Sequence, residues 1–351
     1  MSREAAGIRE RSSPGPDAQE PAPAGFDAAV PVDKKSIVER LFASQAFWVT
    51  VALLIICVAM GFREPRFASE ANFYNITRNF AFIGIMALGM TAVIITGGID
   101  LSVGSIMGVV AVASGLVLEA QYPWYIAVGA GLGAGALCGV INGVLIAYVG
   151  LSAFVVTLGM LSMARSVAVV LSGNRMIYSF GPSGPMFKSF GGGATLGIAN
   201  PVWFMVGLTI LLAVVLKMTS WGRHLFAIGG NEHASTLTGV PVKRIKMQAY
   251  VVSALTASLA AILNVGWSGS AINALGQGYE LRAIASSVIG GANLMGGEGG
   301  AFGALVGSAL IEVIRNSLLM AGVDSNWQGM FVGSFIILAV LLERVRGRRR
   351  D

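Results

Sequence analysis

Charged residues are scarce in this sequence: Asp, Glu, Lys and Arg together make up 12% of its 351 residues. Soluble globular domains carry about a quarter charged residues, so the chain lacks the surface that keeps a protein of this size in water. Because 55% of the residues are hydrophobic, the composition excludes a water-soluble enzyme, a nucleic-acid-binding protein and a disordered scaffold. The sequence predicts a polytopic membrane protein.

The residues that bind metals, form disulfides or bind nucleotides are also few. The two cysteines, Cys57 and Cys138, lie inside apolar runs, which indicates packing and not a disulfide framework or a metal site. None of the six lysines follows a glycine, as the phosphate-binding loop of an ATPase requires. The metalloprotease pattern His-Glu-x-x-His is absent as well. We therefore expect no catalytic residue, no metal and no cofactor on this chain.

The two ends of the sequence differ in composition from the middle. Residues 1–45 contain Pro-, Ala- and Gly-rich stretches such as Pro21–Gly25 and have no apolar periodicity. Such a segment buries too little surface to fold, so we expect a disordered cytoplasmic tail. Residues 46–342 are expected to form one transmembrane domain, and residues 343–351 a basic cytoplasmic tail.

Apolar segments of about the length that a bilayer requires, roughly 20 residues, follow one another from Ala46 onward. The expected fold is an all-α polytopic membrane protein with broken helices, because glycine-rich interruptions divide some of the segments. The segment at 282–294 is short for a full crossing, so eight crossings with two re-entrant segments are the alternative. We expect about ten membrane-spanning helices, at 46–62, 76–96, 101–118, 124–147, 153–171, 200–217, 247–266, 282–294, 301–320 and 328–342.

The distribution of Lys and Arg predicts the orientation, because cytoplasmic loops are enriched in both residues. With the N- and C-termini in the cytoplasm, 16 of the 24 Lys and Arg residues fall on that side. An even number of crossings follows from this count. The basic loop at 218–246 is then cytoplasmic, and the Gly-, Ser- and Pro-rich loop at 172–199 lies outside.

Four ionisable residues are expected at membrane depth: Asp100, Arg165, Glu312 and Arg315. Each costs about 2.5 to 3.5 kcal/mol at the centre of a membrane helix. Glu312 and Arg315 are three residues apart and share a helix face, which predicts a locally neutralised pair. Arg165 is a candidate to pair with an acid on another helix. A carrier driven by protons or sodium normally needs more acids than these.

The segment Thr96–Ser105 (TGGIDLSVGS) predicts a break in a membrane helix. Two glycines end one helix, and the Asp100 carboxylate is placed to cap the next by accepting backbone N–H bonds. Such a break is tolerated at membrane depth only inside protein or beside a water-filled path, so it is either a buried cap or part of the substrate route. The residues of this helix-break motif are Gly97, Gly98, Asp100, Ser102, Gly104 and Ser105.

A later segment, Gly290–Gly297, repeats the pattern of Gly97–Gly104: both read Gly-Gly-x-(Asp or Asn)-Leu-x-x-Gly. Internal duplication is common in transporters and favours a second break of the same kind. A chance match is the alternative in a chain with 47 glycines.

The basic loop holds a third distinctive segment. Asn231 can cap a short helix, Ala234–Leu237 can form about one turn, and Gly239 can end it. A short capped helix between two spans is typical of a docking element for a cytoplasmic partner, whereas a basic loop alone is an orientation signal. We expect His233 to be a surface residue and not a ligand. The residues of the expected docking loop are Gly229, Asn231, Glu232, His233, Ala234 and Gly239.

Three segments together carry a family resemblance: Thr96–Ser105 (TGGIDLSVGS), Ala227–Val240 (AIGGNEHASTLTGV) and Gly290–Gly303 (GGANLMGGEGGAFG). In combination they resemble the permease subunit of ribose/xylose/galactose-type ABC importers, from about residue 46 to residue 342. The branched-chain amino-acid permeases are more distant relatives. Many members of the family carry two alanines where this chain has Ala234 and Ser235.

The resemblance implies a function and a set of partners. Permeases of this family form dimers in the bacterial inner membrane and receive a monosaccharide from a periplasmic binding protein. A cytoplasmic ATPase docks on the short loop helix and drives transport, so ATP hydrolysis belongs to a separate subunit and this chain is not an enzyme. The implied partners are the ATPase, the sugar-binding protein, a second copy of the chain and membrane lipid, with no nucleic acid.

Sugars are usually held by aromatic faces and by hydroxyl and amide groups. The sequence does not say which sugar is transported, and an ion-coupled secondary carrier for a small polar solute is the alternative function. Candidates for the substrate path, each of which can instead make an interhelical hydrogen bond, are Asn79, Asn142, Thr157, Asn264, Trp267 and Asn316.

Overall fold

The computed structural model describes residues 42, 44–324, 327, 329–331, 333, 334 and 337. The chain divides into two units, Met1–Arg40 and Leu41–Asp351, and the helices below belong to the second. Almost all of the expected N-terminal tail, the tail at 343–351 and most of the predicted span at 328–342 lie outside the described residues.

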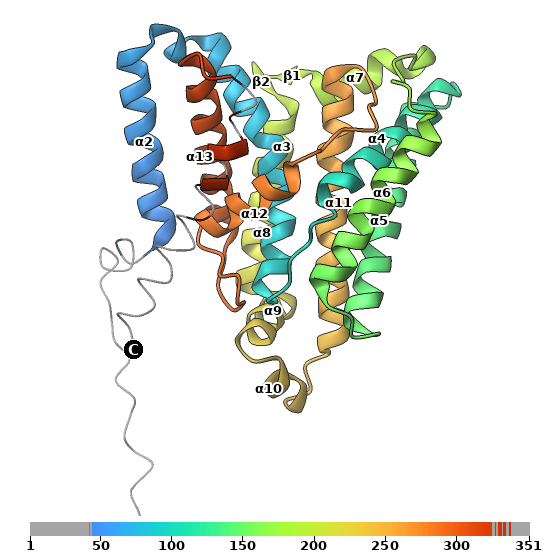
Figure 1. The fold of residues 1–351 in the computed structure, drawn as a ribbon, viewed down its shortest axis with the longest axis vertical. Coiled ribbons are helices and arrows are strands. Elements are labelled where there is room, and N and C mark those ends of the chain that lie inside the picture. The colour runs from blue at the N-terminus through green and yellow to red at the C-terminus, as the bar shows by residue number, and fades with distance from the viewer. Residues whose placement is uncertain are drawn as a thin grey trace, which may run out of the picture. The chain divides into compact units, whose positions relative to one another are not determined.

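Seven of the described helices are long and apolar enough to cross a membrane. Each overlaps one of the predicted segments, and the helical part of the fold class is confirmed. Several of them run roughly side by side in the vertical direction of Figure 1. They are α2 (Gln45–Arg63), α3 (Glu70–Ile95), α5 (Trp124–Ala147), α6 (Ala153–Ser172), α8 (Asn200–Met218), α11 (Val242–Ser268) and α13 (Ala301–Met320).

Two apolar helices are shorter than these. The first, α4 (Val103–Glu119), has 17 residues and the second, α12 (Tyr279–Ile289), has 11. A helix of 11 residues is about 16 Å long, roughly half of the hydrocarbon thickness of a bilayer. The predicted span at 282–294 is therefore not a full crossing by this helix, because the chain turns irregular after Ile289. Nine of the ten predicted segments contain a described helix.

The bundle has two distinguishable ends, which we name the α10 end and the α7 end after the short helices there (Figure 1). The α10 end carries α9 (Ser220–Gly230) and α10 (Glu232–Leu237). The α7 end carries α7 (Gly184–Gly192) and an antiparallel hairpin of β1 (Ala194–Thr195) and β2 (Ile198–Ala199), in which Ala194 pairs with Ala199. Single-turn helices η1 (Pro65–Ala68) and η2 (Gly181–Ser183) complete the described elements.

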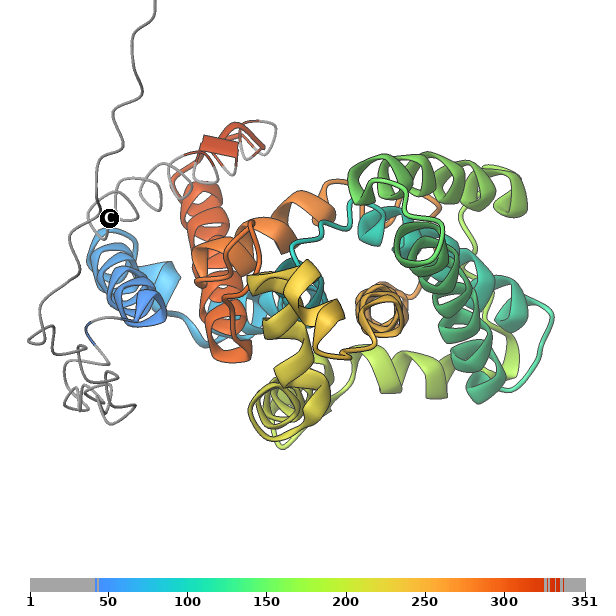
Figure 2. The same cartoon turned by 90° about the horizontal axis from the view of Figure 1, so that it is seen from below.

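Two helices, α3 and α11, form the buried centre of the bundle. Within their candidate spans 83% and 78% of the residues are buried, against 6% for α2. Seen from below, α11 lies between the α5–α6 pair on one side and α3, α12 and α13 on the other (Figure 2). Polar groups in the buried parts of α3 and α11 therefore lie inside the protein, where they need a partner.

A stripe of glycines brings α5 and α11 into close contact. The glycines recur every fourth residue, so they lie on one face of α5. A methyl group at any of them would approach an atom of α11 or α4 to less than 3.0 Å. Small residues at this spacing let two membrane helices pack backbone to backbone. The glycines are Gly131, Gly135, Gly139 and Gly143, and their α11 neighbours include Ser258, Ala254 and Met247.

Candidate functional site

The first helix break begins where α3 ends. Gly97 has a left-handed backbone (φ +78°), its N–H donates to the carbonyl of Ile94 at 2.8 Å, and the N–H of Gly98 donates to that of Val93 at 3.1 Å. This is the Schellman ending that glycine favours. A methyl group on Gly98 would also lie 2.5 Å from the Tyr250 hydroxyl. The predicted end of the helix at the glycine pair is confirmed.

The Asp100 carboxylate is fully buried and accepts three hydrogen bonds. Its Oδ1 accepts from the backbone N–H of Ser102 at 3.0 Å and from the hydroxyl of the same residue at 2.6 Å. Its Oδ2 accepts from the hydroxyl of Ser253 at 3.0 Å, and the Asn142 amide donates to the Ser102 oxygen at 2.9 Å. Asp100 accepts a backbone N–H as predicted, but it does not cap α4: the N-cap residue is Ser102, which makes no side-chain cap hydrogen bond, and the N–H that Asp100 accepts is that of Ser102. The carboxylate thereby joins the break to α5 and α11.

Two polar atoms beside this network have no hydrogen-bond partner within the described part of the chain. They are the Oδ1 of Asn142 and the hydroxyl of Tyr250, and both residues are fully buried. A buried polar atom without a partner costs free energy. The network therefore holds the break firmly, but within the described chain it leaves the Asn142 oxygen and the Tyr250 hydroxyl without hydrogen bonds.

An irregular segment, Gly269–Gly278, lies against the start of α4. A methyl group on Gly104 would collide with the carbonyl of Gly276 and the carboxylate of Glu280, so the predicted close packing at Gly104 is confirmed. Arg165 holds the same segment from α6, because its Nη1 donates to the carbonyls of residues 273 and 275 at 2.7 and 3.2 Å. Arg165 thus binds backbone carbonyls and not an acid, although Glu280 acts on it electrostatically.

The second break follows α12 and repeats the backbone of the first. The N–H groups of Gly291 and the next residue donate to carbonyls of the last turn of α12, and Gly291 has φ +104°. The Oδ1 of Asn293 accepts from the N–H of Met295 at 2.9 Å, two residues on, as Asp100 does. The sequence repeat therefore has a structural counterpart. Only the left-handed glycine is offset by one residue, since Gly97 corresponds to Gly291 and not to Gly290, whereas Asn293 matches Asp100 in the register of the sequence repeat.

The two breaks meet α9 at a contact that we call the glycine junction, made of Gly97, Gly229, Gly296, Gly297 and the carbonyl of Ile95. The N–H of Gly297 donates to that carbonyl at 2.9 Å. A methyl group on Gly229 would collide with the carbonyl and with the N–H of Gly297. One on Gly296 would lie 2.9 Å from Gly229 and 3.0 Å from the nitrogen of Gly97. All three distinctive sequence segments therefore converge here.

The expected short helix of the basic loop is present as α10. The Oδ1 of Asn231 accepts from the N–H of Ala234 at 2.9 Å, and Gly239 follows the helix with φ +82°. Both the predicted cap and the predicted end are therefore confirmed.

The surface of α10 is almost entirely open. Ser235 is buried and the other residues of the helix, His233 included, are exposed. Leu237 is 76% exposed, an apolar side chain at an end of the bundle that sequence analysis had not singled out. Glu232 forms an ion pair with Lys246 at 3.0 Å, which ties α10 to α11.

The structure does not bring the six predicted path residues together. Asn142 belongs to the Asp100 network, and the Thr157 hydroxyl donates to its own helix at 2.8 Å. Asn316 exchanges two hydrogen bonds with Asn72, at 2.8 and 3.1 Å, and so joins α13 to α3. The remaining three, Asn79 on α3 and Asn264 and Trp267 on α11, lie toward the α7 end of those helices.

Sequence reasoning missed several charged and aromatic residues near this end. The guanidinium of Arg78 lies 4.3 Å from the ring centre of Trp267, and that of Arg282 lies 5.3 Å from the ring of Tyr279. The predicted pair of Glu312 and Arg315 is confirmed by two hydrogen bonds, one of them from Nε at 2.7 Å. Arg78 and Arg282 each lie near the start of a predicted apolar segment, at 76–96 and 282–294, and this position was the available signal.

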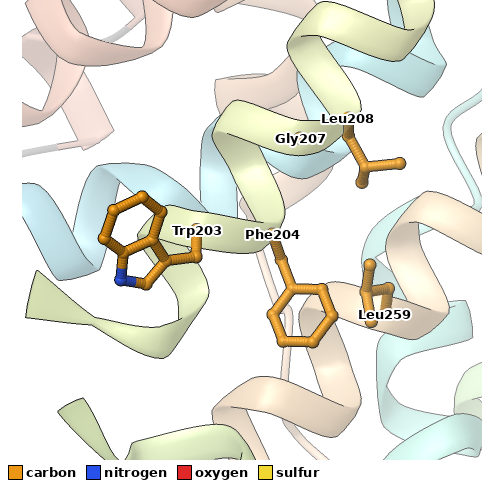
Figure 3. A pocket seen from close by; sticks show the side chains of 5 residues that line it. All are labelled: Trp203, Phe204, Gly207, Leu208 and Leu259. Carbon is orange, nitrogen blue, oxygen red and sulfur yellow. The ribbon is translucent and has the colours of Figure 1, made fainter. Parts of the chain in front are cut away.

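A hollow of about 330 Å³ lies between α8 and α11 (Figure 3). Its lining is apolar, and the indole nitrogen of Trp203 donates to the Thr195 carbonyl at 3.1 Å. A hollow without polar groups does not suit a sugar, which needs hydrogen-bonding partners. Its lining residues are Trp203, Phe204, Gly207, Leu208 and Leu259.

Comparison with known proteins gives one family. Residues 72–341 match the family described as the branched-chain amino acid transport system, permease component. The ribose import permease protein RbsC of Escherichia coli (strain K12) is 38% identical over 295 residues, which cover 84% of this chain and 92% of RbsC.

Two further relatives are named for other substrates. The fructose import permease protein FrcC of Rhizobium meliloti is 34% identical over 328 residues, covering 92% of this chain and 91% of FrcC. The autoinducer 2 import system permease protein LsrD of Photorhabdus temperata is 33% identical over 303 residues, covering 84% and 90%. The matched region contains both breaks, the glycine junction and α10. This chain therefore belongs to the family of membrane-embedded permease components of ABC importers, as its three sequence segments predicted.

Proposed function

We propose that this chain is the transmembrane subunit of an ATP-driven importer in a bacterial inner membrane, with the α10 end in the cytoplasm, and that it forms the path for a monosaccharide. The glycine junction is the observation that carries the proposal, because it links the exposed helix α10, through α9, to both helix breaks. The names of RbsC and FrcC support a monosaccharide as cargo.

The partners follow from the two ends of the bundle. A cytoplasmic ATPase docks on α10, where Leu237 offers an apolar contact and the exposed Asn231, Glu232, His233, Ala234 and Gly239 surround it. A periplasmic binding protein delivers the sugar at the α7 end. A second copy of the chain completes the membrane part, as in the resembling family.

The coupling step is a displacement of α9. Its Gly229 touches the backbone of both breaks without any side chain between them, and close-packed contacts of this kind transmit a shift instead of absorbing it. When the ATPase moves α10, the shift reaches the end of α3 and the segment after α12 together. Of the six predicted path residues, we keep three at the α7 end: Asn79, Asn264 and Trp267. The Asp100 break lies from them toward the α10 end.

The test compares two neighbouring glycines in proteoliposomes that contain the ATPase, the binding protein and the permease. Gly229→Ala introduces a methyl group into the junction, whereas Gly230→Ala meets nothing within 4 Å. We expect the first variant to lose about tenfold or more in ATP-dependent uptake while still binding the ATPase, because overpacking shifts the backbone. The second should behave like the wild type.

Two results would contradict the proposal. One is equal uptake by both variants, which would remove the junction from the coupling route. The other is accumulation of solute by the permease alone under an ion gradient and without nucleotide, which would make the chain an ion-coupled carrier.

A further inference from the structure

One side chain of α2 reaches the base of the second break. The side-chain amide of Gln45, the first residue of α2, donates to the carbonyl of Ile289 at 3.1 Å and to that of Val288 at 3.2 Å. These two residues are the last of α12, so the contact lies directly ahead of the break at Gly290–Gly297. Because carbonyl oxygens only accept hydrogen bonds, both contacts require the nitrogen of the amide, and they fix the orientation of this side chain.

The carbonyl of Ile289 needs a donor from outside its own helix. In a continuing helix it would accept from the N–H of the residue four positions on. That N–H belongs to Asn293 and donates instead to the carbonyl of Glu298 at 3.2 Å. The last carbonyls of any helix need partners from elsewhere. Gln45 supplies one for Ile289, from another span of the bundle.

The helix end that Gln45 holds also packs against α2 and α13. Buried residues of all three helices, among them Val49, Ile289 and Leu310, belong to one apolar cluster. A methyl group on Gly303 of α13 would collide with the carbonyl of Gly290, so α13 meets the end of α12 backbone to backbone. Seen from below, α2 lies beside α13 at the edge of the bundle (Figure 2). The base of the second break therefore belongs to a packed unit, which we call the α2–α12–α13 unit.

Gln45 makes a kind of contact that the rest of α2 does not make with α12. The other side-chain hydrogen bonds from α2 come from Trp48 and Thr50, and they end on the nearby carbonyls of Phe42 and Ala46. Apolar contacts are non-directional, whereas a hydrogen bond weakens steeply when its angle changes. Gln45 therefore fixes where the end of α12 lies against α2, which the apolar cluster alone does not.

We propose that Gln45 is a positioning residue of the importer, which holds the base of the second break to α2 so that the α2–α12–α13 unit moves as one body when the break is displaced. The inference rests on the proposed function, because it names what the shift of α9 moves beyond the glycine junction. With the Gln45 amide in place, a push on Gly297 reaches three helices. Without it, the end of α12 yields alone and absorbs part of the shift.

The test changes the charge and the donor at residue 45. The last turn of α12 carries the negative end of its helix dipole. Gln45→Lys keeps a donor and adds a favourable charge there, whereas Gln45→Glu keeps the shape, removes the donor and adds an unfavourable charge. Ala46→Glu is the matched control, because it adds the same charge one residue away, where the native side chain makes no hydrogen bond.

Hydrogen exchange of the full chain in lipid nanodiscs, followed by mass spectrometry, reads out the two breaks separately. In Gln45→Glu we expect exchange at Gly290–Gly297 to be about fivefold faster or more, because the turn loses its outside partner. Exchange at Thr96–Ser105 should stay unchanged. Gln45→Lys and Ala46→Glu should resemble the wild type at both segments. If Gln45→Glu does not fold, Gln45→Met removes the donor without adding charge and should give the same pattern.

Transport gives a second readout, in proteoliposomes with the ATPase and the binding protein. Gln45→Glu should lower the kcat of uptake several-fold and leave the KM for the sugar unchanged, because the residue acts on the break and is not one of the proposed path residues. Gln45→Lys should restore kcat.

Three results would overturn the positioning role. Equal acceleration of exchange at both breaks in Gln45→Glu would show a general loss of stability, unchanged exchange at the second break would show that the bond holds nothing, and a change in KM alone would place the residue on the path. The exchange measurement involves no ATPase, so its failure would leave the proposed importer role intact. Conversely, uptake without nucleotide would overturn the importer role without affecting the exchange at either break.

Discussion

The two helix breaks share a backbone but differ in what holds them. After Gly97 the chain is fixed by side chains, because the buried Asp100 binds Ser102, just ahead of α4, and Ser253 of α11, and is linked through Ser102 to α5. After Gly291 the chain is held by its own turn and by backbone contacts at the glycine junction, and Met295 is 85% exposed. Similar local sequence thus builds a fixed break within the bundle and a lightly held break at the α10 end. We expect the first to maintain the fold and the second to move.

Removing the Asp100 carboxylate should produce the largest effect on stability. In Asp100→Ala the donors of Ser102 and Ser253 lose their acceptor inside the protein, at a cost of about 3 kcal/mol or more. We expect a lower folded yield and a lower thermal unfolding midpoint in detergent.

Asp100→Asn sharpens this test because it keeps the shape and one acceptor oxygen. If it folds normally and transports normally, residue 100 acts as a hydrogen-bond acceptor that holds the break in place. Normal yield with lost uptake in either variant would instead place Asp100 in the substrate route.

A methyl group at Gly98 should lower stability less than Asp100→Ala does. A second substitution should reverse this loss. It would lie 2.5 Å from the Tyr250 hydroxyl, so Gly98→Ala should cost about 1–3 kcal/mol by overpacking. That hydroxyl has no hydrogen-bond partner among the described residues. Tyr250→Phe alone should therefore be nearly neutral and should restore much of the loss in the double variant, as a double-mutant cycle of thermal unfolding would show. Additive losses would refute the predicted contact.

The equivalent change in the second break should matter least. Asn293→Ala removes one partly exposed hydrogen bond to the Met295 N–H, which contributes about 0.5–1.5 kcal/mol. We expect a shift in unfolding midpoint clearly smaller than that of Asp100→Ala. An equal shift would show that the second break is anchored as firmly as the first, and the comparison would fail.

The sequence was sufficient to predict the features that depend on only a few neighbouring residues. Asn231 and Gly239 define α10 through capping and a left-handed backbone, and the glycine pair at 97 and 98 ends α3 as predicted. Runs of apolar residues located nine helices, because burial in a membrane requires little beyond length and hydropathy.

The features that the sequence did not predict depend on tertiary packing. The depth of Arg282 could not be predicted, because it depends on an irregular segment, Gly269–Gly278, that packs against α4 and α6 ahead of α12. The loop at 172–199 was predicted only as a Gly-, Ser- and Pro-rich outside loop, and the α7 helix and the hairpin that it contains were not predicted. The path residues were scattered for the same reason: Asn142 and Asn316 found partners on other helices, and no spacing in the sequence identifies them.

The glycine stripe of α5 has a mechanical consequence. Because four glycines on successive turns of α5 pack closely against side chains and backbone of α11 and α4, we expect that α5 and α11 cannot slide or rotate against each other without a collision. The pair therefore serves as a stationary frame during turnover, and an engineered covalent cross-link between the two should leave the transport rate unchanged.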